Sequence, residues 1–244
     1  MRRILLTIGY KGTNYSGFQI QNNANTIQQE LENAIKKICN HNVTVFASGR
    51  TDAGVHALKQ TVHFDTESNI KEQNLVNGLN TFLPSDIRVF EARQVDESFH
   101  ARFNAKKKTY MYIYSLNQIV NPVVYDLVSP LKYQIDMELV KKAINLLKGT
   151  HNFKAFCSSG TSVTNFNKTI FDITVEEKDE YLIFKVTGNG FLYNMVRIIM
   201  GTIVDIARGK LALETITKMF DTGDRSLGGS TASQCGLYLY DVEY

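Results

Sequence analysis

An aspartate between two glycines is the residue of this chain whose setting best suits chemistry. Asp52 lies in the segment Gly49-Arg50-Thr51-Asp52-Ala53-Gly54, two residues after an arginine. Glycine permits backbone conformations that other residues resist, so this loop can present a carboxylate to a cleft. Such a carboxylate serves as a nucleophile, a general base, a metal ligand or a plain loop cap. The residues alone leave these alternatives open, although Arg50 favours the ionised form, since a nearby cation lowers the pKa of a carboxylate.

A run of alternating aromatic residues is a second candidate for function. In a strand over 109–115, the side chains of Tyr110, Tyr112 and Tyr114 point to one face. Aromatic rings beside the basic cluster Lys106-Lys107-Lys108 suit an unstacked nucleobase, and stacking contributes roughly 1 to 3 kcal/mol per base. The alternative is a tyrosine-rich sheet face packed under a helix, and the periodicity does not decide between the two.

A third candidate is an arginine on a helix expected over about 191–207. Apolar residues recur on one face of this helix, and the opposite stripe carries Asn194, Arg197, Gly201, Asp205 and Arg208. The simplest interpretation of the stripe is a solvated face, but Gly190 and Gly201 hint at close approach by another backbone. If Arg197 points into a cleft, it is a candidate partner for Asp52. At about 4 Å such a pair is worth roughly 1 kcal/mol in water and roughly 4 kcal/mol at an effective dielectric of 20.

The spacing of apolar residues predicts a β-α-β-β-α-β order in the first half of the chain. The expected elements are a strand over 4–10, a helix over 27–38, strands over 43–47 and through 62–64, a helix over 75–83 and a strand over 87–95. Thr26 and Gln29 have the form of a capping box, and Pro84 ends the second helix. This order is typical of a split βαβ unit, an antiparallel sheet with two helices on one face.

The second half shows a similar pattern. The expected elements are a strand over 109–115, a helix over 136–148 capped by Asp136 and closed by Gly149, a hairpin over 170–175 and 181–186, the helix over 191–207, a short helix over 213–220 and a strand over 237–242. We therefore expect an α+β fold of two split-βαβ halves, ferredoxin- or RRM-like, whose mostly antiparallel sheets meet at a central cleft. Residues 1–104 would carry the aspartate loop, and 105–244 the tyrosine strand and the arginine helix.

Composition sets only broad limits on the class of protein. The 244 residues carry 27 basic and 24 acidic side chains, and a net charge of +3 does not by itself imply a polyanionic partner. Cys39, Cys157 and Cys235 are distant from one another and odd in number, which indicates free thiols. The apolar stretch 4–8 is too short for a signal peptide, and polar residues interrupt 191–207, so we expect a cytoplasmic protein without membrane spans.

The sequence contains no recognised motif for a metal or for a nucleotide cofactor. Asp52, His56, His63 and Asp65 would be the members of a metal site, as in a metal-dependent phosphohydrolase, but no dense metal-binding signature accompanies them. Neither a Walker-type loop nor a GxGxxG loop is present, so no nucleotide cofactor is indicated. We expect neither a metal nor a cofactor.

Several separate motifs resemble those of the TruA family of tRNA pseudouridine synthases, nearly from end to end. They are Gly49 to His56, Gly17-Phe18-Gln19 with Gln21, Thr26-Ile27-Gln28, Phe99-His100-Ala101-Arg102-Phe103, Lys108-Thr109-Tyr110, Gly190 to Arg197, and Gly236-Leu237-Tyr238-Leu239. The resemblance makes Asp52 the nucleophile and Tyr110 the active-site tyrosine. It also implies that Arg197 pairs with Asp52, and it suggests that Arg50 holds the displaced base or its phosphate.

The same resemblance implies a substrate and an assembly. Members of the family act as homodimers that hold tRNA across both subunits and isomerise uridines at positions 38 to 40 of the anticodon stem-loop, with neither metal nor cofactor. This chain departs from the family at Phe18, where a tryptophan is usual, at Asn167-Lys168 and at Gln234-Cys235. A paralogue that acts on another RNA position and a non-catalytic RNA-binding protein are the alternatives.

Overall fold

The computed structural model describes residues 1–160 and 163–244 and divides the chain into two compact units. The first unit comprises Met1–Lys106 with Tyr238–Tyr244, and the second comprises Lys107–Leu237. The expected division at 104/105 gave the last strand to the second half, whereas nearly all of that strand lies in the first unit.

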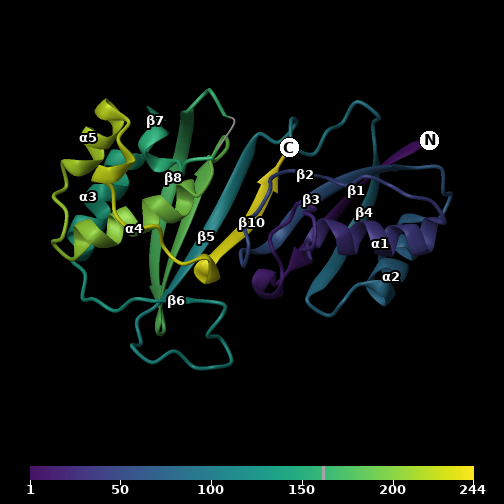
Figure 1. Ribbon diagram of the computed structural model, residues 1–244, viewed down its shortest axis with the longest axis horizontal. Helices are drawn as coiled ribbons and strands as arrows, with labels where there is room; N and C mark the ends of the chain where they lie inside the picture. Colours follow the sequence, from purple (N-terminus) through teal and green to yellow (C-terminus); the bar gives the residue numbers. More distant parts are fainter. Residues whose placement is uncertain (161–162) are drawn as a thin grey trace. The chain divides into compact units, whose positions relative to one another are not determined.

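The first unit has the β-α-β-β-α-β order that the sequence predicts (Figure 1). Its elements are β1 (Arg2–Tyr10), α1 (Ile27–Cys39), β2 (Phe46–Ala47), β3 (His56–Thr66), α2 (Glu72–Phe82), β4 (Ile87–Val95) and, from the end of the chain, β10 (Leu237–Glu243). Strand β1 lies between β3 and β4 and is antiparallel to both. Strand β2 pairs antiparallel with one end of β3, and β10 pairs parallel with its other end.

Helix α1 begins where the capping pattern predicts. The hydroxyl of Thr26 accepts a hydrogen bond from the Gln29 amide at 3.4 Å, and Asn40 ends the helix in a left-handed conformation with φ 60°. The core of this unit combines alternate β1 residues with one face of each helix, at 1% exposure or less: Ile4, Leu6, Ile8, Ile27, Leu31, Ile35, Leu75 and Leu79. The apolar residues that recur at the strand period of two and at the helix period of 3.6 therefore pack together in one layer.

The second unit repeats the β-α-β-β-α part of this order and adds two short strands to it. Its elements are β5 (Lys107–Ser115), β6 (Ser129–Pro130), α3 (Met137–Leu147), β7 (Gly149–Asn152), β8 (Asn167–Lys178), β9 (Tyr181–Gly188), α4 (Met195–Ala207) and α5 (Thr215–Thr222). The strand order β5-β9-β8 corresponds to β1-β3-β2 of the first unit, with β7 added beyond β8. The α+β class and the two related halves are thus confirmed, while a central cleft between them stays a prediction.

Both ends of α3 follow from local sequence. The Asp136 carboxylate accepts hydrogen bonds from the amides of Glu138 and Leu139, which satisfies two free donors at the helix start. After the helix, Gly149 adopts φ +105°, a conformation that disfavours other residues. The helix therefore ends where the sequence predicts.

Helix α4 differs from its prediction in two respects. It begins at Met195 rather than near Phe191, because Asn194 adopts a left-handed conformation with φ 59° that no α-helix can include. Every residue of α4 except Arg197 is buried, so the interpretation of its polar stripe as a solvated face is wrong. The buried Asp205 lies between Arg208 at 2.8 Å and Lys210 at 3.1 Å.

Of the two glycines expected to allow close approach, only Gly201 does so. A Cβ added to Gly201 would overlap the carbonyl oxygen of Ser230, whereas a Cβ on Gly190 would meet nothing within 4 Å. The polar stripe of α4 is therefore covered by the backbone near Ser230.

The strand expected over 43–47 is mostly wrong, since only Phe46–Ala47 pair with β3. The amide of Val45 instead donates to the Glu32 carboxylate at 2.9 Å, and its carbonyl accepts from the Gln28 side chain at 3.2 Å. Side chains of α1 thus replace the strand partner that the extended segment would otherwise need.

Two compositional expectations are addressed directly by the structure. No disulfide joins Cys39, Cys157 and Cys235, all of which lie in the described part of the chain. Across residues 1–160 and 163–244, no helix combines the length and apolar character needed to cross a membrane.

Candidate active site

The loop that carries Asp52 is fastened to the first loop of the chain. The amide of Phe18 donates to the Thr51 carbonyl at 3.0 Å, and the amide of Gly54 donates to the Tyr15 carbonyl at 3.2 Å. The Asp52 carbonyl accepts from the amide of Val55 at 3.1 Å and closes a tight turn. The backbone on both sides of the carboxylate is therefore held before any substrate arrives.

Two glycines make this fastening possible. Gly54 completes the turn with φ +73°, as the sequence pattern anticipates, whereas Gly49 does not adopt a positive φ. Gly17 adopts φ +97°, and a Cβ there would lie only 2.8 Å from the Thr51 carbonyl oxygen. The Gly17-Phe18-Gln19 motif is thus a direct support of the Asp52 loop.

Buried polar side chains hold the loop from below. Gln60 is fully buried, accepts a hydrogen bond from the Ser48 hydroxyl at 2.6 Å and donates to the Gly49 carbonyl at 2.8 Å. The hydroxyls of Tyr10 and Thr51 are 2.8 Å apart. Burial raises the pKa of Tyr10 to about 12 against the opposing effect of its hydrogen-bonded neighbours, so this phenol remains a neutral support at ordinary pH.

Sequence reasoning missed these supports. One signal was present, because Gln60 interrupts an otherwise apolar strand segment, and a buried polar side chain needs partners. Tyr10 and Thr51 carried no comparable signal, since their contact joins segments 41 residues apart.

Arg50 lies two residues before Asp52 in sequence, and its side chain is exposed. Within residues 1–160 and 163–244, no side chain or backbone group forms a hydrogen bond or ion pair with its guanidinium. Its donors are therefore available to a phosphate or a base from outside the chain.

The three tyrosines of β5 differ in their contacts. Tyr112 and Tyr114 are buried, with ring centroids 4.6 Å apart, and the Tyr112 hydroxyl donates to the Ser233 carbonyl at 2.7 Å. For these two the packed-face alternative is correct. Tyr110 is also largely buried, at 9% exposure, and its ring meets that of Phe191 edge to face at 5.0 Å, so its role as a base platform stays a prediction.

Arg197 is held by two neighbours within the second unit. Its Nη1 donates to the Asn194 side-chain oxygen at 2.8 Å, and its Nε donates to the Ala232 carbonyl at 2.7 Å. A guanidinium has five N–H groups, so these bonds leave donors for a further acceptor. Asp52 and Arg50 thus belong to the first unit, Tyr110 and Arg197 belong to the second, and the pairing of Asp52 with Arg197 stays a prediction.

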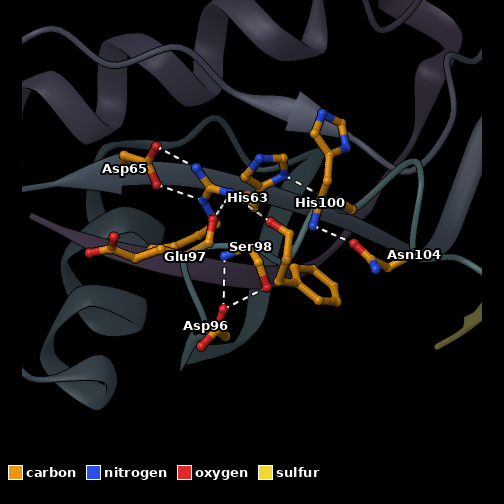
Figure 2. Close-up of polar contacts among 10 residues, drawn as sticks. His63, Asp65, Asp96, Glu97, Ser98, His100 and Asn104 are labelled. Carbon is orange, nitrogen blue, oxygen red and sulfur yellow. Dashed lines mark hydrogen bonds and ion pairs between the residues drawn. The ribbon is translucent and has the colours of Figure 1, made fainter.

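Three of the four side chains of the alternative metal site, those of His56, His63 and Asp65, form hydrogen bonds with other parts of the first unit. Both oxygens of Asp65 accept hydrogen bonds from Arg3, at 2.7 and 2.8 Å, and His63 Nδ1 accepts from the Ala101 amide at 3.2 Å (Figure 2). His56 Nδ1 accepts from the Gly12 amide at 3.0 Å. Burial and the neighbouring His100 and Arg3 lower the pKa of His63 to about 4. No group of three potential ligands is suitably placed in the parts of the chain that the structure describes.

The cluster in Figure 2 instead fixes the segment that precedes the boundary between the units. Arg3 also donates to the carbonyl of Phe99 at 2.8 Å, and the His100 amide donates to the Asn104 side chain at 2.6 Å. The Asp96 carboxylate accepts from the amide and the hydroxyl of Ser98. These contacts assign His63 and Asp65 a structural role.

Comparison with known proteins identifies the family to which this arrangement belongs. A family model described as tRNA pseudouridine synthase matches residues 7–104 and 143–244, which together make up most of the chain. The chain belongs to the tRNA pseudouridine synthase family. That family consists of isomerases, and its matched segments contain Asp52, Arg50 and Arg197.

Curated members of this family are similar to the chain along its whole length. The tRNA pseudouridine synthase A of Anoxybacillus flavithermus (strain DSM 21510 / WK1) is 45% identical, with 100% of this chain and 99% of the relative covered. Those of Exiguobacterium sp. (strain ATCC BAA-1283 / AT1b) and Thermoanaerobacter sp. (strain X514) are 42% and 41% identical, with 100% of this chain and 98% and 100% of the relatives covered. The expected resemblance is thus confirmed.

Proposed function

We propose that this chain isomerises uridine to pseudouridine at positions 38 to 40 of the tRNA anticodon stem-loop, with Asp52 as the catalytic carboxylate. The observation that carries the proposal is the Asp52 loop, which Gly17, Phe18 and Gln60 hold in place. A preorganised carboxylate needs no rearrangement as the reaction begins, and catalysis rewards such positioning.

The reaction breaks the bond between N1 of uracil and C1′ of the ribose and forms a bond between C5 and C1′. The hydrogen on C5 leaves to solvent and N1 gains a proton, so the nucleotide keeps its composition. Asp52 assists the cleavage, either by attacking the sugar or by removing a proton from it. Neither a metal nor a cofactor has a place in this scheme.

The other site residues would present the base to Asp52. The target uridine must leave the helical stack, which costs a few kcal/mol. Tyr110 would stack on the displaced base, and Arg50 would hold that base or its phosphate. Arg197 would keep Asp52 ionised and aimed. We further propose that two copies of the chain hold one tRNA in the cytoplasm, as the family resemblance implies.

Release of tritium from tRNA labelled at uracil C5 tests the proposal directly, because isomerisation expels that hydrogen. We expect release with tRNA that contains uridines 38 to 40, and none with a transcript in which cytidine replaces them. Equal release from both transcripts would show that another position is the target.

The basic residues Lys106, Lys107 and Lys108 should bind the tRNA backbone. Changing all three to alanine removes positive charge, so the slope of log affinity against log salt should become less steep by about one to three. Filter binding over a salt series measures the slope. The matched control changes Lys141 and Lys142, of which Lys141 is paired with Glu138. Equal slopes in the Lys106–Lys108 variant and the unchanged protein would contradict this role.

Gly17 should affect turnover through the loop that it supports. Gly17→Ala places a Cβ against the Thr51 carbonyl, so the Asp52 loop must shift, and we expect kcat to fall by about 10-fold or more. Gly209→Ala is the matched control, because Gly209 shares a positive φ of +75° but a Cβ there meets nothing within 4 Å. Steady-state kinetics of tritium release should distinguish the two variants. Equal kcat values would show that the contact with Thr51 is irrelevant to turnover.

A further inference from the structure

We propose that Asn194 and the segment 228–232 are positioning elements that hold the Arg197 guanidinium in one orientation. The inference rests on the proposed role of Arg197 and extends it to residues outside the reaction itself. Three groups of contacts within the second unit carry it.

Asn194 holds the guanidinium from the start of α4. Its side-chain oxygen accepts from Arg197 Nη1 at 2.8 Å, and its side-chain nitrogen donates to the Ser158 hydroxyl at 3.0 Å. Its left-handed backbone, with φ 59°, is one that asparagine tolerates better than most residues. A single residue thus ends the preceding loop and anchors one arm of Arg197.

The segment 228–232 holds the guanidinium from the other side. The Ala232 carbonyl accepts from Arg197 Nε at 2.7 Å, and the Ala232 amide donates to the Arg197 carbonyl at 3.1 Å. Side chain and backbone of the same arginine are therefore bonded to one residue. Because the two side-chain bonds use different edges of a planar group, they fix its direction and its rotation.

This segment is itself seated on α4. A Cβ on Gly201 would overlap the Ser230 carbonyl, and a Cβ on Gly229 would lie 2.6 Å from the Gly201 carbonyl. The Gly229 amide donates to the Thr202 hydroxyl at 3.1 Å. Facing glycines let two backbones approach closely, which no larger residue permits.

The Asp205 carboxylate also holds the segment 228–232 against α4. Its carboxylate accepts from the Ser230 amide at 3.3 Å and pairs with Arg208 and Lys210. Burial alone would raise the pKa of Asp205, but the bonds from Arg208, Lys210 and Ser230 hold it below the usual value. The buried carboxylate is thus an ionised acceptor beneath the segment that holds Arg197.

The orientation of Arg197 matters because turnover depends on geometry more strongly than tRNA binding does. A misplacement of about 1 Å at a reacting group can cost about 100-fold in rate. Loss of the contacts that orient Arg197 should therefore lower kcat and leave the KM for tRNA nearly unchanged. A merely structural role would instead lower the folded fraction and leave kcat per folded molecule intact.

Two substitutions of Asn194 separate its side chain from its backbone. Asn194→Gly keeps the left-handed conformation and removes the acceptor, so kcat per folded molecule should fall by about 10- to 100-fold. Asn194→Asp keeps an acceptor, to which the Ser158 hydroxyl can donate, and should restore most of the rate. Tritium release in multiple-turnover, steady-state conditions measures kcat, filter binding measures affinity, and circular dichroism gives the folded fraction.

Gly201 supplies a second, independent variant. Gly201→Ala displaces the segment from α4 and should lower kcat in the same way, whereas Gly190→Ala adds a Cβ where nothing lies within 4 Å and should not. Arg197→Gln is measured in parallel. If Arg197→Gln retains full turnover, the proposed role of Arg197 fails. If only Arg197→Gln loses turnover, while Asn194→Gly and Gly201→Ala match the unchanged protein, the positioning inference is overturned and the proposed function stands.

Discussion

An Asp52→Ala protein should bind tRNA with nearly unchanged affinity and release no tritium from uracil C5 above background. The carboxylate carries the chemical step in the proposed scheme, so its loss should cost at least about 10⁴-fold in rate, the scale on which removal of a nucleophile acts. The fold should survive, because backbone groups around Asp52 and the side chain of Gln60 still hold the loop in this variant.

Two further variants define that experiment. Asp52→Asn keeps the shape of the side chain and removes its charge, so it should be as inactive as the alanine variant. Asp241→Ala removes another carboxylate of the first unit, one that lies 3.9 Å from Lys59 at the surface, and should leave turnover intact. Substantial release by the Asp52→Ala protein would remove Asp52 from the reaction.

The Arg197→Gln variant should lose turnover by about 10²- to 10⁴-fold, because removal of one partner from a desolvated ion pair costs about 3 to 5 kcal/mol. The proposed partner is Asp52, and the loss should appear in kcat rather than in tRNA affinity. Arg197→Lys restores the charge without the planar fork that bonds to Asn194 and Ala232. We therefore expect it to recover only part of the rate.

The comparison of kcat with affinity decides what Arg197 does. If Arg197→Gln weakens tRNA binding as much as turnover, Arg197 contacts RNA rather than the catalytic carboxylate. If Arg197→Lys equals the unchanged protein, charge alone is sufficient and the orientation of the guanidinium is unimportant.

Local signals predicted most of the elements around the site. The strand expected over 87–95 has the bounds of β4, and Thr26 and Asp136 cap their helices as expected. In each case the determinants lie within a few residues of the element they define. The βαββα order follows for the same reason, since each period is visible in a short window.

Contacts between segments that are distant in the chain could not be predicted from the sequence. The polar stripe of α4 has the periodicity of a solvated face, yet backbone about 30 residues further along the chain covers it at Gly201. Val45 has the composition of a strand residue, yet Glu32 and Gln28 satisfy its backbone. In both places tertiary packing overrode a local preference, which a single sequence does not reveal.

The candidate site divides in the same way. The type and spacing of residues made Asp52 a candidate without excluding a plain loop cap, and the family resemblance supplied its expected role. The hydrogen-bonded support from Tyr10, Thr51 and Gln60 became visible only in three dimensions. The sequence thus indicates which group would react, and the fold indicates what keeps that group in place.

Mapping pseudouridine in tRNA from cells with and without this protein tests the central claim most directly. The proposed function predicts pseudouridine at positions 38 to 40 that disappears when the protein is removed and returns with the unchanged protein but not with Asp52→Ala. An unchanged pseudouridine map in the absence of the protein would contradict it.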